Sequence, residues 1–68
     1  MKYFVNEIQN DTSTTYVFDD LPAAESKYYY ILSFAAVSDV AVHGAVLYDN
    51  NGAWFASKTY RHSTDEQV

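Results

Sequence analysis

One change in the spacing of the apolar residues constrains the fold of this chain most strongly. Segments 2–9 and 14–18 are rich in β-branched and aromatic residues, which is typical of strands. The pattern becomes helical after Asp20, which suits an N-cap, and Pro22 is tolerated in a first helical turn. The sequence therefore predicts two strands joined by a turn at 10–13, followed by a helix over 21–37.

The predicted helix has one apolar face. At 100° per residue, Ala24, Tyr28, Ile31 and Ala35 fall on one line. We expect this line to pack on a sheet, because the alanines allow a close approach. Two further apolar residues flank it, namely Leu32 and Phe34.

Asp49-Asn50-Asn51-Gly52 is the clearest turn signal in the chain. Asp49 suits the first position of a type I turn, and Gly52 suits the left-handed residue of a three-residue hairpin loop. Strands over 40–48 and 53–61 then pair with Tyr48 opposite Trp54. A two-residue Asn51-Gly52 loop would shift that pairing by one residue. The three-residue loop also predicts the pairs Val46–Ala56, Val42–Tyr60 and Leu47–Phe55.

These elements predict an α+β fold of ββαββ type, with a four-stranded antiparallel sheet and one helix packed on one face. A right-handed crossover favours the strand order 2-1-3-4. We expect residues 1–62 to form the single domain and 63–68 to form a polar C-terminal tail. One helix covers only one face, so the other is open. It should carry some of Tyr3, Val5, Tyr16 or Val17, and either Leu47 with Phe55 or Tyr48 with Trp54.

The composition excludes several classes of site. A chain of 68 residues without cysteine has neither disulfides nor a thiolate zinc site, and His43 and His62 are too few for a metal cluster. A domain this short buries only about 60% of its unfolded surface. Without disulfides or metals, a partner subunit is the usual remedy, so we expect a homo-oligomer with no cofactor.

The charge balance bears on the partners. Four Lys and Arg against nine Asp and Glu give a net charge of −5, which argues against nucleic-acid binding. No apolar stretch approaches the ~20 residues of a membrane span, and no signal peptide is evident. We therefore expect a cytoplasmic protein that binds no membrane.

His43 is the one candidate general base or ligand. General acid–base catalysis needs a nearby partner group, and the sequence offers none, so we interpret His43 as a packed strand histidine. Gly44 inside a strand indicates a bulge or a close backbone approach. The carboxylates Asp19 and Asp20 are better explained by helix capping than by catalysis. We assign no catalytic residue.

Exposed aromatic residues point to protein contacts instead. Tyr29 and Tyr30 should be partly exposed on the helix flank, and tyrosine suits interfaces. On the open sheet face, Leu47 with Phe55 and the cross-strand pair Tyr48 with Trp54 are the further candidates. The predicted interface residues are therefore Tyr29, Tyr30, Leu47, Tyr48, Trp54 and Phe55.

Two segments carry a resemblance to known proteins. In residues 25–47 a helix ends in the letters AAVS (residues 35–38) and a V-x-V-H strand follows (residues 40–43). With residues 2–9, this segment resembles a set of short uncharacterised proteins of phages and mobile elements from Gram-positive, often gut, bacteria. The resemblance implies a phage or prophage accessory role and names no activity.

We therefore expect a non-enzymatic accessory protein that acts by protein–protein contact as a homo-oligomer. One alternative is an inhibitor of a host defence protein, of anti-CRISPR or other anti-defence type, that binds a basic surface. Clustering of Glu7, Asp19, Asp20 and Glu25 would favour it. Another is a small-ligand binder or enzyme near His43 at a subunit interface, which would need a pocket of about 300 Å³.

Overall fold

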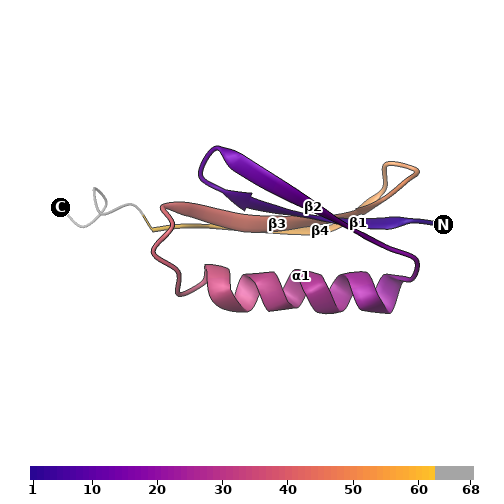
Figure 1. Ribbon diagram of the computed structural model, residues 1–68, viewed down its shortest axis with the longest axis horizontal. Helices are drawn as coiled ribbons and strands as arrows, with labels where there is room; N and C mark the ends of the chain where they lie inside the picture. The colour runs from indigo at the N-terminus through magenta and orange to yellow at the C-terminus, as the bar shows by residue number, and fades with distance from the viewer. Residues whose placement is uncertain (63–68) are drawn as a thin grey trace.

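The computed structural model describes residues 1–62 and contains four strands and one helix (Figure 1). The strands pair antiparallel in the order β2-β1-β3-β4, and α1 lies against one face of the sheet. The predicted ββαββ fold and strand order are confirmed. The predicted tail at 63–68 lies outside the described residues. The elements are β1 (Tyr3–Gln9), β2 (Thr12–Phe18), α1 (Leu21–Ala35), β3 (Val42–Asp49) and β4 (Trp54–Arg61).

The β1–β2 hairpin turns on two residues. Asn10 has a φ of 57°, a left-handed conformation that asparagine tolerates, and Gln9 pairs with Thr12. The Thr12 hydroxyl donates to the Gln9 carbonyl oxygen over 2.8 Å. Strand β2 therefore begins two residues before the predicted start at 14.

The helix begins and ends through local hydrogen bonds. The Asp20 side chain accepts the Ala23 N–H over 2.8 Å, which confirms the predicted N-cap. The helix ends at Ala35, because the N–H of Val37 bonds three residues back to Phe34 in a tighter turn. The prediction that it continues to 37 is wrong.

The second hairpin confirms the predicted loop but not the whole register. The Asp49 N–H donates to the Ala53 carbonyl over 3.0 Å, and Gly52 has a φ of 88°. Tyr48 pairs with Trp54 as expected, but a bulge then leaves Phe55 without an opposite residue. Each pair beyond it moves by one position, so the three predicted pairs are wrong. The observed pairs are Val46–Ser57, Val42–Arg61 and Leu47–Ala56.

The core lies between α1 and the two central strands. The predicted line of Ala24, Tyr28, Ile31 and Ala35 is buried, as expected. The helix packs on alternate residues of β1 and β3, so the opposite residues of these strands form the open face. Of the open-face candidates, Tyr3, Val5, Tyr16 and Leu47 lie in or against the core instead.

Candidate functional site

An uninterrupted row of apolar residues crosses the open face of the sheet. Val17, Phe4, Tyr48 and Trp54 are neighbours in the strand register, one from each strand. The rings of Phe4 and Tyr48 are stacked with centroids 5.3 Å apart, and Tyr48 lies 6.5 Å from Trp54. Trp54 is 69% exposed. We call these four residues the aromatic row.

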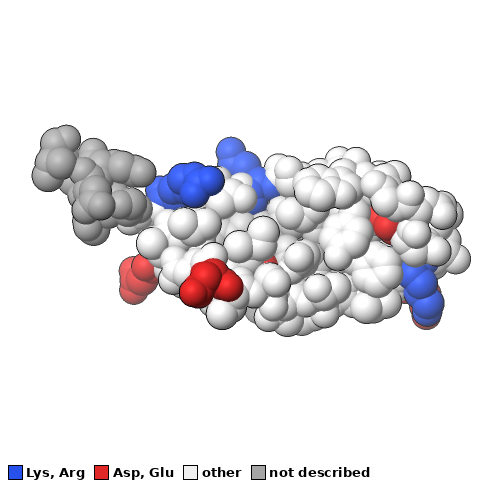
Figure 2. Space-filling view, turned by 90° about the horizontal axis from the view of Figure 1, so that it is seen from above, with Lys and Arg blue, Asp and Glu red and all other residues white. Residues whose placement is uncertain are grey.

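The surface around the aromatic row carries little charge. Figure 2 views the sheet from the side opposite α1 and shows a mostly uncharged surface, with the charged side chains largely at its margins. The next residues along β1 and β3 on this face are uncharged as well, namely Asn6, Ile8, Gly44 and Val46. An apolar, nearly uncharged sheet face is typical of a contact surface.

The structure divides the predicted interface residues on the sheet between its two faces. Tyr48 and Trp54 belong to the open face. Leu47 is only 2% exposed and lies in the core beneath α1. Phe55 is 47% exposed, but its ring lies 6.1 Å from Tyr3, on the helix side. The placement of Leu47 and Phe55 on the open face is therefore wrong.

Phe4 is the member of the aromatic row at β1 that the sequence interpretation did not include among its candidates. It shares a strand face with Asn6 and Ile8, but only the pairing of β1 with β3 places its ring against Tyr48. The alternation of residues in β1 placed Phe4 on one face of the strand. It did not show whether the helix covers that face.

The helix exposes aromatic residues on two sides. Tyr29 and Tyr30 are exposed as predicted. Phe34, which was expected beside the sheet-facing line, is 52% exposed and packs edge to face against Tyr30 at 4.9 Å. The Lys27 ammonium lies 4.2 Å from the ring centre of Tyr16 in β2 and 5.3 Å from that of Tyr30. Lys27, Tyr30 and Phe34 therefore form a helix flank on the β2 side.

His43 belongs to a hydrogen-bonded network of three polar side chains. Its Nε2 lies 2.8 Å from Oε2 of Glu7 in β1, and its Nδ1 lies 2.9 Å from the Ser38 hydroxyl in the connection after α1. His43 is 5% exposed. The expectation that His43 has no partner is wrong, because 36 residues separate it from Glu7 and only strand pairing brings them together.

Electrostatics favour an ionised Glu7 in this chain. Burial opposes ionisation, but hydrogen bonds from His43, Gln9 and Tyr16 outweigh it and hold the pKa of Glu7 below its ordinary value. The carboxylate accepts the Nε2–H of His43, and Nδ1 of the same ring contacts the Ser38 hydroxyl. The three groups link β1, β3 and the segment after α1.

The Glu7–His43–Ser38 network has the same types of side chain as a nucleophilic serine site, but it lacks a substrate pocket in the described residues. A histidine held by a carboxylate can take a proton from a serine hydroxyl. However, the described residues enclose no pocket beside Ser38, and His43 is buried. Within residues 1–62 no three His, Asp or Glu side chains gather as metal ligands. The arrangement therefore suits a structural link better than a reaction.

The acidic residues do not form a single cluster. Glu7 bonds to His43 near the C-terminal end of α1, whereas Asp19 and Asp20 precede its N-terminal end. In the β1–β2 register Glu7 lies opposite Thr14, five residues before Asp19, which corresponds to about 17 Å along a strand. Asp19 is also paired with Lys2. The clustering that would favour a nucleic-acid-like inhibitor is absent from this part of the chain.

Comparison with known proteins finds no matching family model, no matching curated protein and no matching solved structure. Within the described part of the chain, α1 is too short and too polar to cross a membrane.

Proposed function

We propose that this protein is a non-enzymatic accessory protein that acts by protein–protein contact, and that its open sheet face joins two identical copies. The accessory role follows the resemblance to short phage and mobile-element proteins. The observation that carries the proposal is the aromatic row, which crosses all four strands on the face opposite α1.

The small core supports a permanent partner. Among residues 1–62, seven apolar residues are buried, and three of them are alanines. Eight large apolar residues in the described part of the chain remain exposed, including Trp54 and Val17 of the aromatic row. Such a chain gains stability when its apolar face is covered. A second copy is the partner that is present whenever the protein is made.

Charge also favours a second copy on this face. The chain carries a net charge of −5, so two copies repel each other wherever their acidic groups meet. The aromatic row has no charged member, and a two-fold contact through it brings like residues together without like charges. Face-to-face sheets pack about 10 Å apart with interdigitating side chains, which large aromatic residues can fill.

Light scattering behind size exclusion tests the proposal with two neighbouring aromatic residues. Trp54→Glu places a charge on the open face, whereas Phe55→Glu places the same charge on the helix side. We expect the wild type and Phe55→Glu to elute at the same multiple of the 7.7 kDa chain mass, and Trp54→Glu at a smaller multiple. A wild type that elutes as a single chain at micromolar concentration would overturn the proposal. So would equal effects of the two variants.

A further inference from the structure

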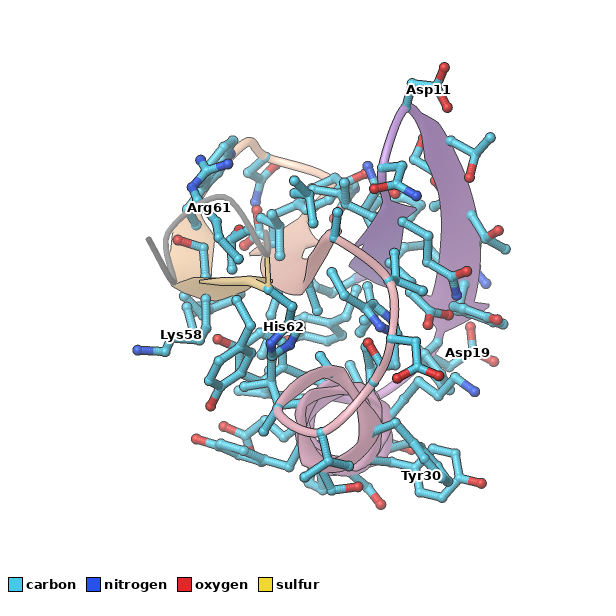
Figure 3. All side chains as sticks on the ribbon, turned by 90° about the vertical axis from the view of Figure 1, so that its left-hand side faces the viewer. Asp11, Asp19, Tyr30, Lys58, Arg61 and His62 are labelled. Carbon is cyan, nitrogen blue, oxygen red and sulfur yellow. The ribbon has the colours of Figure 1, made fainter. Side chains whose placement is uncertain are left out.

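The two edges of the sheet differ in how well they are protected. Strand β4 carries a bulge and the charged residues Lys58 and Arg61, which are features that block pairing with another strand. Strand β2, at the other edge, has seven residues without charge, proline or bulge. Figure 3 shows Lys58 and Arg61 on one side of the molecule and the β2 edge on the other.

The hydrogen-bond pattern shows which groups of β2 are free to pair. The Asn10 N–H donates to Val42, and the Asn50 N–H donates to Lys2, so the even-numbered residues of β1 bond to β3. In an antiparallel ladder the bonding direction alternates, so the odd-numbered residues of β1 bond to β2. Their partners there are residues 12, 14, 16 and 18. The backbone groups of Ser13, Thr15 and Val17 therefore point outward from the edge.

The helix flank extends this edge into a second layer. Tyr30 and Phe34 are 56% and 52% exposed, on the side of α1 where Lys27 reaches across to Tyr16 of β2. Figure 3 shows Tyr30 projecting from α1 on the side where β2 forms the sheet edge. A strand added next to β2 would lie above this flank and cover apolar surface that the four-stranded sheet leaves exposed.

We propose that β2 pairs antiparallel with β2 of a second copy, and that the paired edges join two four-stranded sheets into one of eight strands. With Thr15 opposite its own counterpart, all seven residues of β2 take part. Ser13 then faces Val17, and Thr14 faces Tyr16, which are pairs of polar, β-branched and aromatic residues that stabilise antiparallel sheets. No charged pair arises within the strand. The inference extends the proposed function, since it assumes an assembly of identical copies, but it uses a different surface.

The spacing of the two helices agrees with this arrangement. Helix α1 packs beneath β1 and β3, so two helices in the joined sheet would lie four strand spacings, or about 19 Å, apart. A helix is about 10 Å wide, which leaves a gap of roughly 9 Å between them. Tyr30 and Phe34 project into this gap from both copies. The edge contact and the face contact use different surfaces, so four copies can make both contacts, as in a tetramer of D2 symmetry whose two-fold axes cross at right angles.

Thr15→Pro is the sharpest variant for this inference. Proline removes the outward N–H at the centre of the proposed pairing, and proline is tolerated in edge strands where the N–H faces solvent. Thr15→Val is the matched control, because it also removes the hydroxyl but keeps the N–H. We expect the wild type and Thr15→Val to scatter as tetramers of about 31 kDa, four times 7.7 kDa, and Thr15→Pro at half that mass.

A second substitution protects the test against misfolding. If circular dichroism shows that Thr15→Pro does not fold, Phe34→Asp decides the question, because Phe34 lies outside the core and faces the gap between helices. It should also halve the mass. Combining either variant with Trp54→Glu should give single chains.

Two results would overturn the inference. One is a wild type that scatters as a single chain. The other is a folded Thr15→Pro protein with the same mass as Thr15→Val. If Thr15→Pro does not fold, the same result for Phe34→Asp has the same meaning. Either result is expected if β2 pairs only with a strand of another protein. The proposed face contact is judged separately by Trp54→Glu, so either interface can fail while the other stands.

Discussion

Gly44→Ala should destabilise the protein through a clash that can be read from the structure. A Cβ at this position would lie 2.5 Å from the Lys58 carbonyl oxygen, and 2.7 Å from both Cα and Oγ1 of Thr59. The first two are main-chain atoms of β4, which cannot rotate away as a side chain can. The β3–β4 pairing must therefore open locally to admit a methyl group.

The size of the effect follows from two opposing contributions. Forcing an extra carbon into a closely packed position typically costs about 1–3 kcal/mol. Replacing glycine by alanine also restricts the unfolded chain, which stabilises the folded state by about 0.4–1 kcal/mol. Because the contact is with backbone, we expect the clash to dominate, with a net loss of about 2 kcal/mol. In a domain of this size that lowers the melting temperature by roughly 8–16 °C.

Thermal and denaturant unfolding measure this loss, at equal protein concentrations because association raises apparent stability. Gly52 is the matched control. It has a φ of 88° and no atom within 4 Å of an added Cβ, so Gly52→Ala suffers only from backbone conformation. Gly52→Asn should recover part of that loss, since asparagine tolerates the left-handed region. A Gly44→Ala protein as stable as the wild type would refute the close approach of β4.

Three further variants test the interior and the helix start. Folding lowers the pKa of Glu7, so the ionised Glu7 stabilises the fold fully at pH values above its ordinary pKa of 4.5. This stabilisation is lost as the pH falls through the lowered pKa. Melting curves from neutral to acid pH should show the loss in the wild type and not in Glu7→Gln. Asp20→Ala removes the helix cap and should cost about 1 kcal/mol in denaturant unfolding. Leu47→Ala should lower the free energy of unfolding by about 2–5 kcal/mol, enough to reduce the folded fraction seen by circular dichroism. The same truncation of an exposed residue on the open face would lower it far less.

The features that depend on neighbouring residues were predictable from the sequence. The Asp20 cap and the left-handed Gly52 each depend on a few adjacent positions, and both predictions are confirmed. The line of Ala24, Tyr28, Ile31 and Ala35 depends only on helical periodicity. With the right-handed crossover rule, these signals were enough for the ββαββ fold and its strand order.

The features that depend on contacts between distant strands were not predictable. Apolar residues alternate on both faces of β3, so the pattern alone does not show that α1 covers Ala45 and Leu47 rather than Val46 and Tyr48. The bulge at Phe55 follows no local signal, and its extra residue places that ring on the helix side. The Glu7–His43 contact needs β1 and β3 to be adjacent and in register.

The distribution of apolar residues links the stability of this protein to its proposed assembly. The interior is built largely from alanines and medium-sized side chains, while Trp54, Tyr30 and Phe34 lie on surfaces proposed to contact other copies. Full burial of one large apolar side chain contributes about 1.5–3 kcal/mol, which is a large share of what the core of so small a domain can supply. Covering the open face and the β2 edge would therefore stabilise the fold as well as join the copies. Folding stability should then rise with protein concentration in the wild type, and this dependence should weaken in any variant that removes one of the two contacts.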